Sequence, residues 1–590
     1  MDTKTTPLAS LDEDITCDVL VAGAGGGGLA TAVMAAALGL RVVIIEKSSV
    51  VGGSTAISGG GAWVPCSSHS VRAGIEDNKA QARAYLAAHL GEFFRPELVD
   101  AFLDNAPAAL DFLEASSEVR FRVATDVPDY YPQCPGSTMG GRSLDTAPYD
   151  GRRLGAQFKY LRRPLATLTV LHGMMIPRED VPFFQTWHRS FRSFARVARR
   201  ALRHGFDLAV WGRATRLANG NALAARLFRS ALDSDIPIVL NTRLVELISE
   251  NGRVAGAFVE GRSGSARKTR RFRVDARYGV VVACGGFPWN EALKARLYPH
   301  VATGKAHRSL VPDTNAGESL SLVRALGGRL DTHLAHPAAW VPASEVPQRD
   351  GSSVLFPHFV DFHKAGFILV NRRGKRFVNE SLSYQEVTPT IIAAIAEEAT
   401  PEVYLICDRK TLRREGMGVV PPGPLPLRRH IRTGYLVTAP TVAALAAKLG
   451  VDGAELEASV QRFNGFVETG VDADYGRGSD AYQRYRHGGT GRVESTNPCL
   501  APLATPPFYA VRVRPSDIGS FMGIRIGSGA AVLDQQDRPI AGLYAVGADA
   551  ASVFGGKYPA GGANLGPAIV FAYLAARQLA ATTAQADRQG

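Results

Sequence analysis

Cysteine is scarce in this chain, and none of it occurs in a paired motif. The 590 residues include six cysteines, and no two of them form a Cys-x-x-Cys pair. Structural zinc sites, iron–sulfur clusters and disulfide frameworks depend on characteristic cysteine spacings, so the sequence predicts none of them. His333, His336, His358 and His363 match no metal-site spacing either. We therefore expect no bound metal.

Long apolar segments are also missing. No apolar run approaches the roughly 20 residues that a transmembrane helix needs. The first fifteen residues are polar and lack the basic start and apolar core of a signal peptide. The net charge of +12 is largely a surplus of arginine, and no nucleic-acid-binding module accompanies it. We expect a soluble, cytoplasmic protein that binds no nucleic acid.

Much of the arginine lies in one amphipathic segment, residues 187–204. At helical spacing, one face carries Trp187, Phe191, Phe194, Ala198 and Leu202, and the opposite face carries Arg189, Arg192, Arg196, Arg199 and Arg203. One interpretation is a helix that packs its aromatic face on the core and leaves its basic face solvated. The other is weak contact of this helix with a membrane surface, which would make the protein peripheral to the membrane and suit an oily substrate.

A glycine-rich turn near the start of the chain stands between apolar segments. Residues 17–22 are apolar, Gly23-Ala24-Gly25-Gly26-Gly27-Gly28 follows, small residues run to Leu40, and residues 41–45 end in Glu46. This order is typical of a dinucleotide-binding fold, in which glycines admit a pyrophosphate to a helix N-terminus and the acid binds ribose hydroxyls. Glu46 lies at roughly the expected ~20 residues after the turn. The sequence therefore predicts a dinucleotide site.

Length and composition indicate more than one domain, because a domain typically holds ~100–200 residues. Residues 1–294 carry the dinucleotide pattern and include a helical insertion at about 155–215. Residues 295–494 are richer in proline, aromatics and histidine, whereas residues 495–590 again show the sequence pattern of residues 1–294. We expect an α/β fold in which a Rossmann-like domain is interrupted by an inserted α+β domain.

The residue pattern also places individual elements. Helices are expected at about 75–115, at about 185–232 with a break at Gly220-Asn221, and at 566–579. Strands are expected at 236–240, 244–248, 254–259, 280–283 and 542–547. The glycine-rich residues 52–61 and 284–286 are expected to approach a ligand closely.

Several motifs along the chain occur together in one known family. They are the dinucleotide turn with Glu46-Lys47, residues 52–61, Ala283-Cys284-Gly285-Gly286-Phe287, residues 366–384 with Asn379-Glu380-Ser381, and Tyr544-Ala545-Val546-Gly547 with residues 558–566. In this order they resemble the flavoproteins of the fumarate reductase/succinate dehydrogenase superfamily, and within it the 3-ketosteroid dehydrogenases. The resemblance covers nearly the whole chain and implies that the cofactor is FAD.

The resemblance also implies which residues bind FAD. They are Gly23, Gly25, Gly28, Glu46, Lys47 and Val245 for the ADP half, Ser54, Thr55, Ser58, Gly59 and Gly60 for the phosphates and flavin ring, Ala283 and Gly285 at a second close backbone approach, Gly547 and Asp549 in the C-terminal segment, and Asn564 and Leu565 at the start of the last helix. The positive end of that helix would face the flavin. Residues 47–61 contain no histidine, where some relatives attach FAD covalently, so we expect non-covalent FAD.

The same resemblance assigns the chemistry to tyrosines. Tyr558 and Gly562 match the pair that polarises a ketone oxygen, and Tyr384 matches the tyrosine that removes the adjacent proton. Tyr130 is the match for a supporting tyrosine, with Tyr131 nearly as good a candidate. Two donors aimed at the ketone oxygen would stabilise an enolate. A phenol with a pKa of about 10 needs hydrogen bonds or nearby positive charge to act as a base.

The implied function is FAD-dependent Δ1-dehydrogenation of a hydrophobic, cyclic, steroid-like 3-ketone, with an unidentified electron acceptor. Ala560 stands where Δ4-dehydrogenases have a serine, which disfavours Δ4 chemistry, and residues 559–561 differ from the Pro-Gly-Pro of many Δ1 enzymes. Three alternatives stay open: a Δ4-dehydrogenase, a fumarate-reductase-like ene-reductase, and a flavin-binding electron-transfer subunit without its own substrate pocket.

Overall fold

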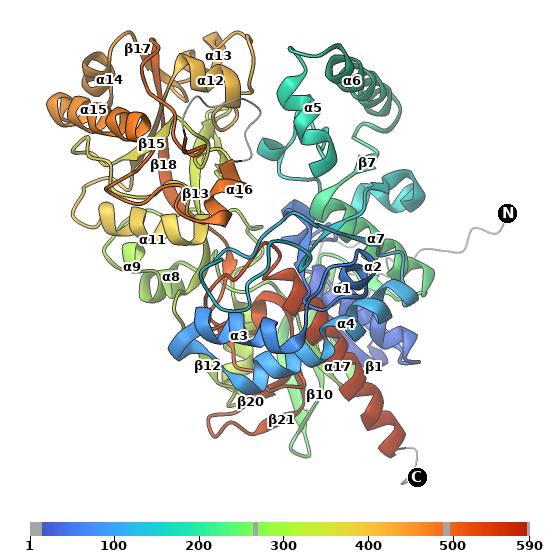
Figure 1. Cartoon of the computed structure of the whole chain (residues 1–590). Helices are drawn as coiled ribbons and strands as arrows, with labels where there is room; N and C mark the ends of the chain where they lie inside the picture. Colours follow the sequence, from blue (N-terminus) through green and yellow to red (C-terminus); the bar gives the residue numbers. More distant parts are fainter. Residues whose placement is uncertain (1–13, 263–268, 488–495, 587–590) are drawn as a thin grey trace.

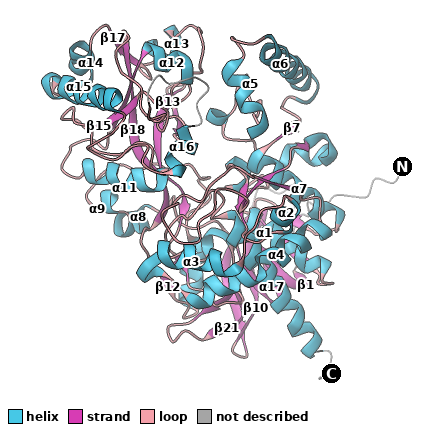
Figure 2. Ribbon diagram, viewed as in Figure 1, coloured by secondary structure: helices cyan, strands magenta, loops and turns pink. Residues whose placement is uncertain are grey.

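The computed structural model describes residues 14–262, 269–487 and 496–586. The first thirteen residues and the expected domain boundary at 494–495 lie outside this part. Two large sheets, each with its own helices, form most of the molecule. Helices α5 (Val181–Thr186) and α6 lie to one side, at the level of the second of these sheets (Figure 1). Figure 2 shows the same arrangement coloured by helix and strand.

The first sheet follows the dinucleotide pattern. Its strand order is β20-β21-β11-β1-β2-β8, with β10 pairing β11 and β9 pairing β10. β1 (Ile15–Ala22) lies parallel between β2 (Val42–Ile45) and β11 (Thr269–Val282), and α1 (Gly26–Ala37) follows the glycine turn. The other strands are β8 (Ile238–Val239), β9 (Arg243–Glu250), β10 (Arg253–Arg262), β20 (Ala531–Leu533) and β21 (Pro539–Ala545). The predicted strand, turn, helix and strand are confirmed.

The terminal helix closes this domain. α17 (Leu565–Ala586) packs against α1 and α4 (Pro96–Ser116). Its window Leu565–Thr582 is long and apolar enough to cross a membrane, which the sequence analysis did not register, and half of that window is buried inside the protein. Because its apolar surface is used in packing against neighbouring helices, α17 is a core helix.

The inserted domain has a second sheet with strand order β14-β13-β18-β16-β15, and β17 pairs with β18. These strands are β13 (Ala338–Pro347), β14 (Ser353–Pro357), β15 (Phe367–Val370), β16 (Val403–Asp408), β17 (Val437–Ala439) and β18 (Phe508–Ser520). α11 (Tyr384–Ala394) packs on β13 and β18. β18 belongs to this sheet although it follows residue 495, so the chain returns to the first domain after Ser520.

Shorter elements complete the described chain. They are β3 (Gly61–Trp63), α2 (Ser68–Arg72), α3 (Lys79–Leu90), β4 (Phe121–Val123), β5 (Ser143–Thr146), β6 (Tyr149–Asp150), α8 (Glu291–Leu297), α9 (Pro299–Ala302), α10 (Glu318–Ala325), β12 (Leu330–Asp331), α12 (Arg409–Glu415), α13 (Arg428–Arg432), α14 (Val442–Leu449), α15 (Gly453–Thr469), α16 (Ala481–His487) and β19 (Gly523–Ile524). The 75–115 region is two helices, α3 and α4, because Gly91 takes φ +58° between them.

The break in the second helical region is not where the sequence analysis put it. α6 (Phe191–Trp211) ends at Gly212, which takes the left-handed conformation, and α7 (Asn219–Asp233) starts after the short strand β7 (Arg216–Leu217). Gly220 and Asn221 therefore lie inside the first turn of α7. A Cβ at Gly220 would meet the Thr55 oxygen at 1.9 Å, so this glycine serves close packing rather than a helix break.

α6 does not pack the expected face on the core. Phe191 is 85% exposed and Leu202 77%, so the expected packing of this aromatic and aliphatic face on the core is wrong. Arg196 pairs with the buried Asp180, which lies outside α6, whereas the pair of Arg203 with Asp207 lies within the helix. Because a buried carboxylate needs a cationic partner, Asp180 holds Arg196 toward the protein, and the apolar stripe stays outside.

Candidate active site

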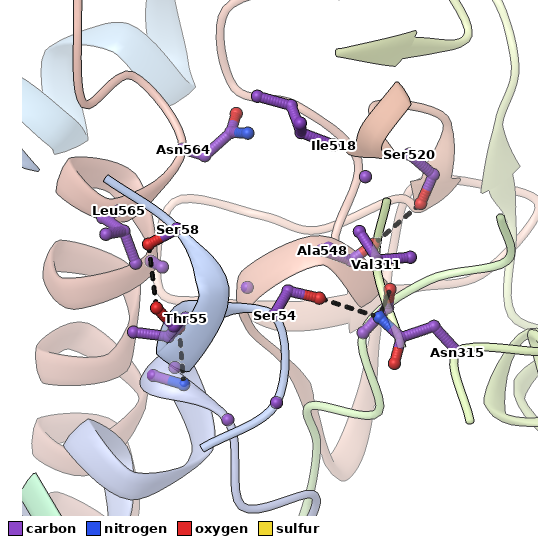
Figure 3. Close-up of a pocket in the computed structure, with 18 of the residues that line it drawn as sticks. Ser54, Thr55, Ser58, Val311, Asn315, Ile518, Ser520, Ala548, Asn564 and Leu565 are labelled. Carbon is purple, nitrogen blue, oxygen red and sulfur yellow. Dashed lines mark hydrogen bonds between the residues drawn. The ribbon is translucent and has the colours of Figure 1, made fainter. Parts of the chain in front are cut away.

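One cavity of about 510 Å³ connects the two glycine-rich ends of the chain, a size typical of small-molecule sites. The assigned residues that line it are Gly23, Gly25, Glu46, Lys47, Ser54, Thr55, Ser58, Gly59, Gly60, Ala283, Gly285, Gly547, Asn564, Leu565, Tyr130, Tyr384, Tyr558 and Gly562. Figure 3 shows part of this lining, with Asn564 and Leu565 at the start of α17. The structure therefore brings most of the assigned residues to one place.

The glycine turn has the form that a bound dinucleotide requires. Gly25 and Gly59 line the cavity, and a Cβ on either would meet no protein atom within 4 Å. The space beside them is thus open, and a larger side chain would fill it. The first turn of α1 also lines the cavity at Gly26 and Gly27, and the N–H groups of a helix N-terminus suit a pyrophosphate. These residues fit FAD.

Three assigned residues, Gly28, Val245 and Asp549, lie outside the cavity lining. A Cβ at Gly28 would meet the Gly23 oxygen at 2.0 Å, so Gly28 allows α1 to pack closely on the strands, as the third glycine of such turns does. Val245 follows Leu244, which lines the cavity, but is not itself part of the lining.

Glu46 is held at the end of β2 by backbone donors. Its two carboxylate oxygens accept hydrogen bonds from the N–H groups of Ala24 (2.7 Å) and Ser48 (2.7 Å). Burial raises the pKa of this carboxyl, and the two backbone donors oppose the effect. The group thus ties the glycine turn to the following loop and keeps an acceptor at the cavity, where a ribose hydroxyl could donate to it.

Glu46→Gln should weaken FAD retention. The amide nitrogen cannot accept from a backbone N–H, so one charge-assisted hydrogen bond is lost, worth about 1.5–3 kcal/mol. Dissociation of FAD measured by fluorescence on dilution checks this, with thermal unfolding as the control for the fold. Unchanged affinity would mean that Glu46 does not hold the cofactor.

Acid treatment of the unmodified protein should release free FAD, as expected for non-covalent binding.

The loop after Glu46 is ordered against the cavity by its own hydrogen bonds (Figure 3). Thr55 Oγ1 accepts from the Gly26 N–H (3.1 Å), and Ser58 Oγ donates to the Thr55 oxygen (2.9 Å). Asn315 Nδ2 donates to Ser54 Oγ (3.1 Å) and to the Gly285 oxygen (2.9 Å). The sequence analysis missed Asn315, because no motif surrounds it and its partners are far away in sequence.

Asp549 does not line the cavity. It holds in place the turn at Ala283 and Gly285, where the backbone approaches the cavity a second time. Its buried carboxylate accepts from the N–H groups of Cys284 (2.6 Å) and Gly286 (2.9 Å). These bonds hold the turn that carries Ala283 and Gly285 beside the cavity. Asp549 therefore acts on the site through that turn.

Tyr558 sits on a loop that several elements hold in place. The Pro559 oxygen accepts from Tyr85 Oη (2.6 Å) and from the Tyr130 N–H (3.0 Å). Gly562 takes φ +97°, and a Cβ there would meet the Ala62 carbonyl carbon at 2.6 Å, so only glycine fits. Burial raises the pKa of Tyr558, and the nearby Gly562 N–H opposes this rise. The two donors of the expected ketone clamp therefore lie together.

Tyr384 is the first residue of α11. Ser383 precedes it as the N-cap and forms a capping box with Glu386, which fixes where the helix begins. The Tyr384 ring lies 5.6 Å from the Tyr558 ring, and Tyr130 Oη lies 3.4 Å from Tyr384 Oη. Of the two candidates for the supporting tyrosine, Tyr130 lines the cavity, whereas Tyr131 stacks on His89 at 3.9 Å.

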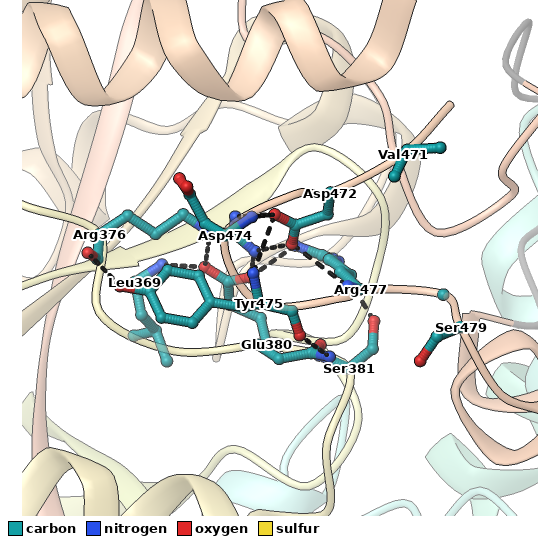
Figure 4. Close-up of polar contacts among 12 residues, drawn as sticks. Leu369, Arg376, Glu380, Ser381, Val471, Asp472, Asp474, Tyr475, Arg477 and Ser479 are labelled. Carbon is teal, nitrogen blue, oxygen red and sulfur yellow. Dashed lines mark hydrogen bonds and ion pairs between the residues drawn. The ribbon is translucent and has the colours of Figure 1, made fainter. Parts of the chain in front are cut away.

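A buried ionic network anchors the segment that leads into Tyr384 (Figure 4). Glu380 accepts from Arg376 (2.8 Å) and Arg477 (3.0 Å), and Arg376 also pairs with Asp472 (2.7 Å). Arg477 Nε donates to Ser381 Oγ (3.1 Å). Two arginines and two carboxylates balance one another, and removal of one would leave a buried charge uncompensated. The Asn379-Glu380-Ser381 motif is therefore a structural support for Tyr384.

The tyrosine end of the cavity combines apolar walls with one cation. Leu165, Leu168, Phe359, Val360, Ile518 and Phe521 contribute apolar lining, and Arg486 on α16 lines the same end. Burial raises the pKa of Tyr384 well above its ordinary value and raises that of Tyr130. The sequence analysis missed Arg486, because it lies in no motif and its contacts, Phe359 and His363, are far away in sequence.

Two of the histidines considered as metal ligands, His358 and His363, have hydrogen-bond partners within the protein. His358 Nδ1 bonds to Asp361 (2.7 Å), and His363 lies between the carbonyl oxygens of Phe359 and Glu380. Within the described residues, no three His, Cys, Asp or Glu side chains gather in a group that could hold a metal ion.

Comparison with known proteins agrees with this geometry. Residues 18–565 match the family described as FAD binding domain. The chain is 37% identical to 4-oxocyclohex-2-ene-1-carboxylate 5-dehydrogenase of Sinomonas cyclohexanicum, covering 96% of this chain and 94% of that protein. It is 34% identical to 3-oxosteroid 1-dehydrogenase of Mycobacterium tuberculosis, covering 95% and 98%.

A solved structure matches over the same length. The crystal structure of 3-ketosteroid delta1-dehydrogenase from Sterolibacterium denitrificans, in complex with 1,4-androstadiene-3,17-dione, has a TM-score of 0.87 and 31% identity, covering 96% of this chain and all of that one. The resemblance, the α/β fold with its inserted domain and the FAD cofactor are therefore confirmed. The chain belongs to the FAD binding domain family, and within it to the FAD-dependent dehydrogenases of cyclic ketones that include the 3-oxosteroid 1-dehydrogenases.

Proposed function

We propose that this enzyme removes two hydrogens from a steroid-like 3-ketone and forms the Δ1 double bond. The observation that carries the proposal is the convergence of Tyr130, Tyr384, Tyr558 and Gly562 at one end of the cavity. Proton abstraction next to a ketone needs a base at the carbon and donors at the oxygen, and this set offers both. The apolar walls support a hydrophobic ring as substrate.

The chain's own residues divide the work. Tyr558 Oη and the Gly562 N–H donate to the ketone oxygen and stabilise the charge that grows there. Tyr384, as tyrosinate, takes the proton from the adjacent carbon, while Tyr130 Oη donates to Tyr384 Oη. The electron pair of that C–H bond becomes the new double bond as a hydride leaves the next carbon. When bound, FAD supplies the acceptor for that hydride.

An anaerobic substrate panel tests the proposal. A 3-ketosteroid should bleach the flavin absorbance, and mass spectrometry should find a product two hydrogens lighter whose new double bond is at Δ1. A product with a double bond at Δ4 would replace this assignment. Reoxidation of reduced flavin by fumarate would favour the ene-reductase, and a response to neither would favour an electron-transfer role.

A second substrate class is a ring ketone that carries a carboxylate. The relative from Sinomonas cyclohexanicum is named for such a compound, and Arg486 is a cation that could receive a carboxylate at this end of the cavity. 4-Oxocyclohexanecarboxylate belongs in the same panel. A higher kcat/KM for it than for any steroid would make the carboxylated ring the preferred substrate.

We also propose that α6 contacts a lipid surface, which would make the protein peripheral to a membrane. Phe191, Phe194, Leu202 and Phe206 form one exposed stripe along the helix. Arg192 and Arg199 are exposed at its edge, and no ion pair holds either among the described residues. An apolar stripe flanked by unpaired cations complements an anionic bilayer, which offers both a hydrocarbon layer and negative headgroups.

Replacement of Phe191 and Leu202 by serine should weaken sedimentation with phosphatidylglycerol vesicles at least about tenfold, because two large apolar contacts are lost. Val71→Ser with Val471→Ser is the matched control, since these side chains are 68% and 62% exposed elsewhere on the surface. FAD content should not change. Equal vesicle binding by all variants contradicts the proposal, and loss of a dimer instead would make the stripe a contact between copies.

A further inference from the structure

Arg486 brings a positive charge to the tyrosine end of the cavity without a carboxylate partner among the described residues. Its Nη2 donates to the Phe359 carbonyl oxygen and to His363 Nε2 (2.8 Å), and its buried Nε has no partner there. A half-buried cation surrounded by neutral groups is costly unless something compensates its charge. The position of this guanidinium therefore calls for a negative charge that arises during function.

His363 fixes the orientation of the guanidinium. Its Nδ1 lies 3.2 Å from the Glu380 carbonyl oxygen, and its Nε2 faces Arg486. The same Nε2 also lies 2.7 Å from the Phe359 carbonyl oxygen, to which Arg486 Nη2 donates, so the imidazole and the guanidinium meet at one backbone acceptor. Burial lowers the pKa of His363 well below its ordinary value, and the Arg486 charge adds to that effect. His363 therefore adds no positive charge beside Arg486.

Beyond these direct contacts, phenols lie around the Arg486 charge. The Arg486 guanidinium carbon lies 6.0 Å from the centre of the Tyr482 ring, which lies 4.8 Å from the Tyr130 ring. Burial raises the pKa of Tyr130, and the Arg486 charge opposes that rise. Tyr130 in turn contacts Tyr384 through the 3.4 Å distance between their hydroxyl oxygens.

We propose that Arg486 is the electrostatic partner of the Tyr130–Tyr384 pair and stabilises the tyrosinate that removes the substrate proton. This inference rests on the proposed function. Before turnover the Tyr384 O–H bond breaks and its proton leaves to solvent; during turnover the tyrosinate takes the proton of the substrate C–H bond. Between these events a negative charge stays within apolar walls, where a nearby cation stabilises it far more than in water.

Other titratable groups face this cluster from every neighbouring element. They are Tyr482 and Tyr485 on α16, His363 and Lys364 before β15, Tyr131 on the 128–132 loop, Glu386 on α11, and Tyr558 on the C-terminal loop. All of them stay unchanged in a variant at position 486. A change confined to such variants therefore reports the Arg486 charge.

The test compares Arg486→Gln and Arg486→Lys in the FAD-loaded full chain, with Arg484→Gln as a control on an exposed side chain of the same helix. Anaerobic flavin reduction by a neutral 3-ketosteroid is followed from neutral to alkaline pH. Arg486→Gln should move the profile to higher pH by at least about one unit and slow reduction about tenfold at neutral pH. Arg486→Lys should recover most of this loss, and Arg484→Gln should match the unmodified protein.

Ultraviolet titration of tyrosinate without substrate gives a second readout that needs no turnover. Loss of the cation should delay the titration of the pair in Arg486→Gln, even if no ketone proves to be a substrate, so failure of this inference is distinguishable from failure of the proposed function. An unchanged pH profile of flavin reduction together with an unchanged tyrosinate titration overturns the inference. A rise in KM confined to 4-oxocyclohexanecarboxylate also overturns it and makes Arg486 a carboxylate-binding residue. If Arg486→Gln loses FAD or fails to fold, the pH profile of flavin reduction in Arg486→Lys still decides. A residual shift of that profile to higher pH supports the inference.

Discussion

Tyr558→Phe should lower kcat by about 10²–10³, the usual cost of removing one donor from an oxyanion site. The hydroxyl deleted lies beside the Gly562 N–H, which stays in place. Charge on the ketone oxygen grows as the adjacent proton leaves, so the lost interaction is stronger in the transition state than in the ground state. The effect should therefore fall on kcat more than on KM.

Exchange of the substrate α-hydrogen with deuterated solvent separates this role from an effect on the flavin. Exchange should slow in parallel with turnover, whereas photoreduction of the flavin should stay as in the unmodified protein. Ser143→Ala is a useful control, because Ser143 Oγ donates to the Gly561 oxygen (3.0 Å) and supports the same loop without offering a donor to the ketone. Normal exchange with collapsed hydride transfer would mean that Tyr558 acts on the flavin.

The parts of the fold that local sequence dictates were predictable. A buried strand, a glycine turn and a helix follow one another within residues 15–37, so their signal needs no information from elsewhere. The glycine-rich lining of the cavity was predictable for the same reason, since motifs at both ends of the chain are contiguous and each marks a close backbone approach. Tyr384 and Tyr558 came with such motifs, and both line the cavity.

Structural features that depend on contacts between residues far apart in the sequence were not predictable. The orientation of α6 depends on Asp180, a buried carboxylate outside the helix that pairs with Arg196, and hydrophobic periodicity alone cannot report this. Asn315 joins Ser54 to Gly285 across the domain, and no local pattern marks it. Gly220 looked like a helix breaker because its close approach to Thr55 is visible only in three dimensions.

The second prediction with a large expected effect on turnover concerns Tyr384, the proposed proton-abstracting base. Tyr384 is buried at the start of α11, and burial raises its pKa well above the ordinary value. In the proposed mechanism the active form of Tyr384 is the tyrosinate, so a raised pKa means that little of it exists at neutral pH. Activity should then rise with pH from neutral toward the alkaline range, by up to tenfold per unit. A flat profile would leave a tyrosinate base without support.

Tyr384→Phe should lower turnover by about 10²–10⁴, the range for loss of a general base. The phenyl ring preserves the packing against Phe359 (5.3 Å) and Tyr558 (5.6 Å), so FAD content and thermal unfolding should stay unchanged. Any residual activity should lose the alkaline rise, because the titrating group is gone. Tyr131→Phe is the matched control, since that phenol lies outside the cavity lining and should leave turnover within a few-fold. If Tyr384→Phe retains turnover within a few-fold and keeps the alkaline rise, another group removes the proton and Tyr384 has no part in the mechanism.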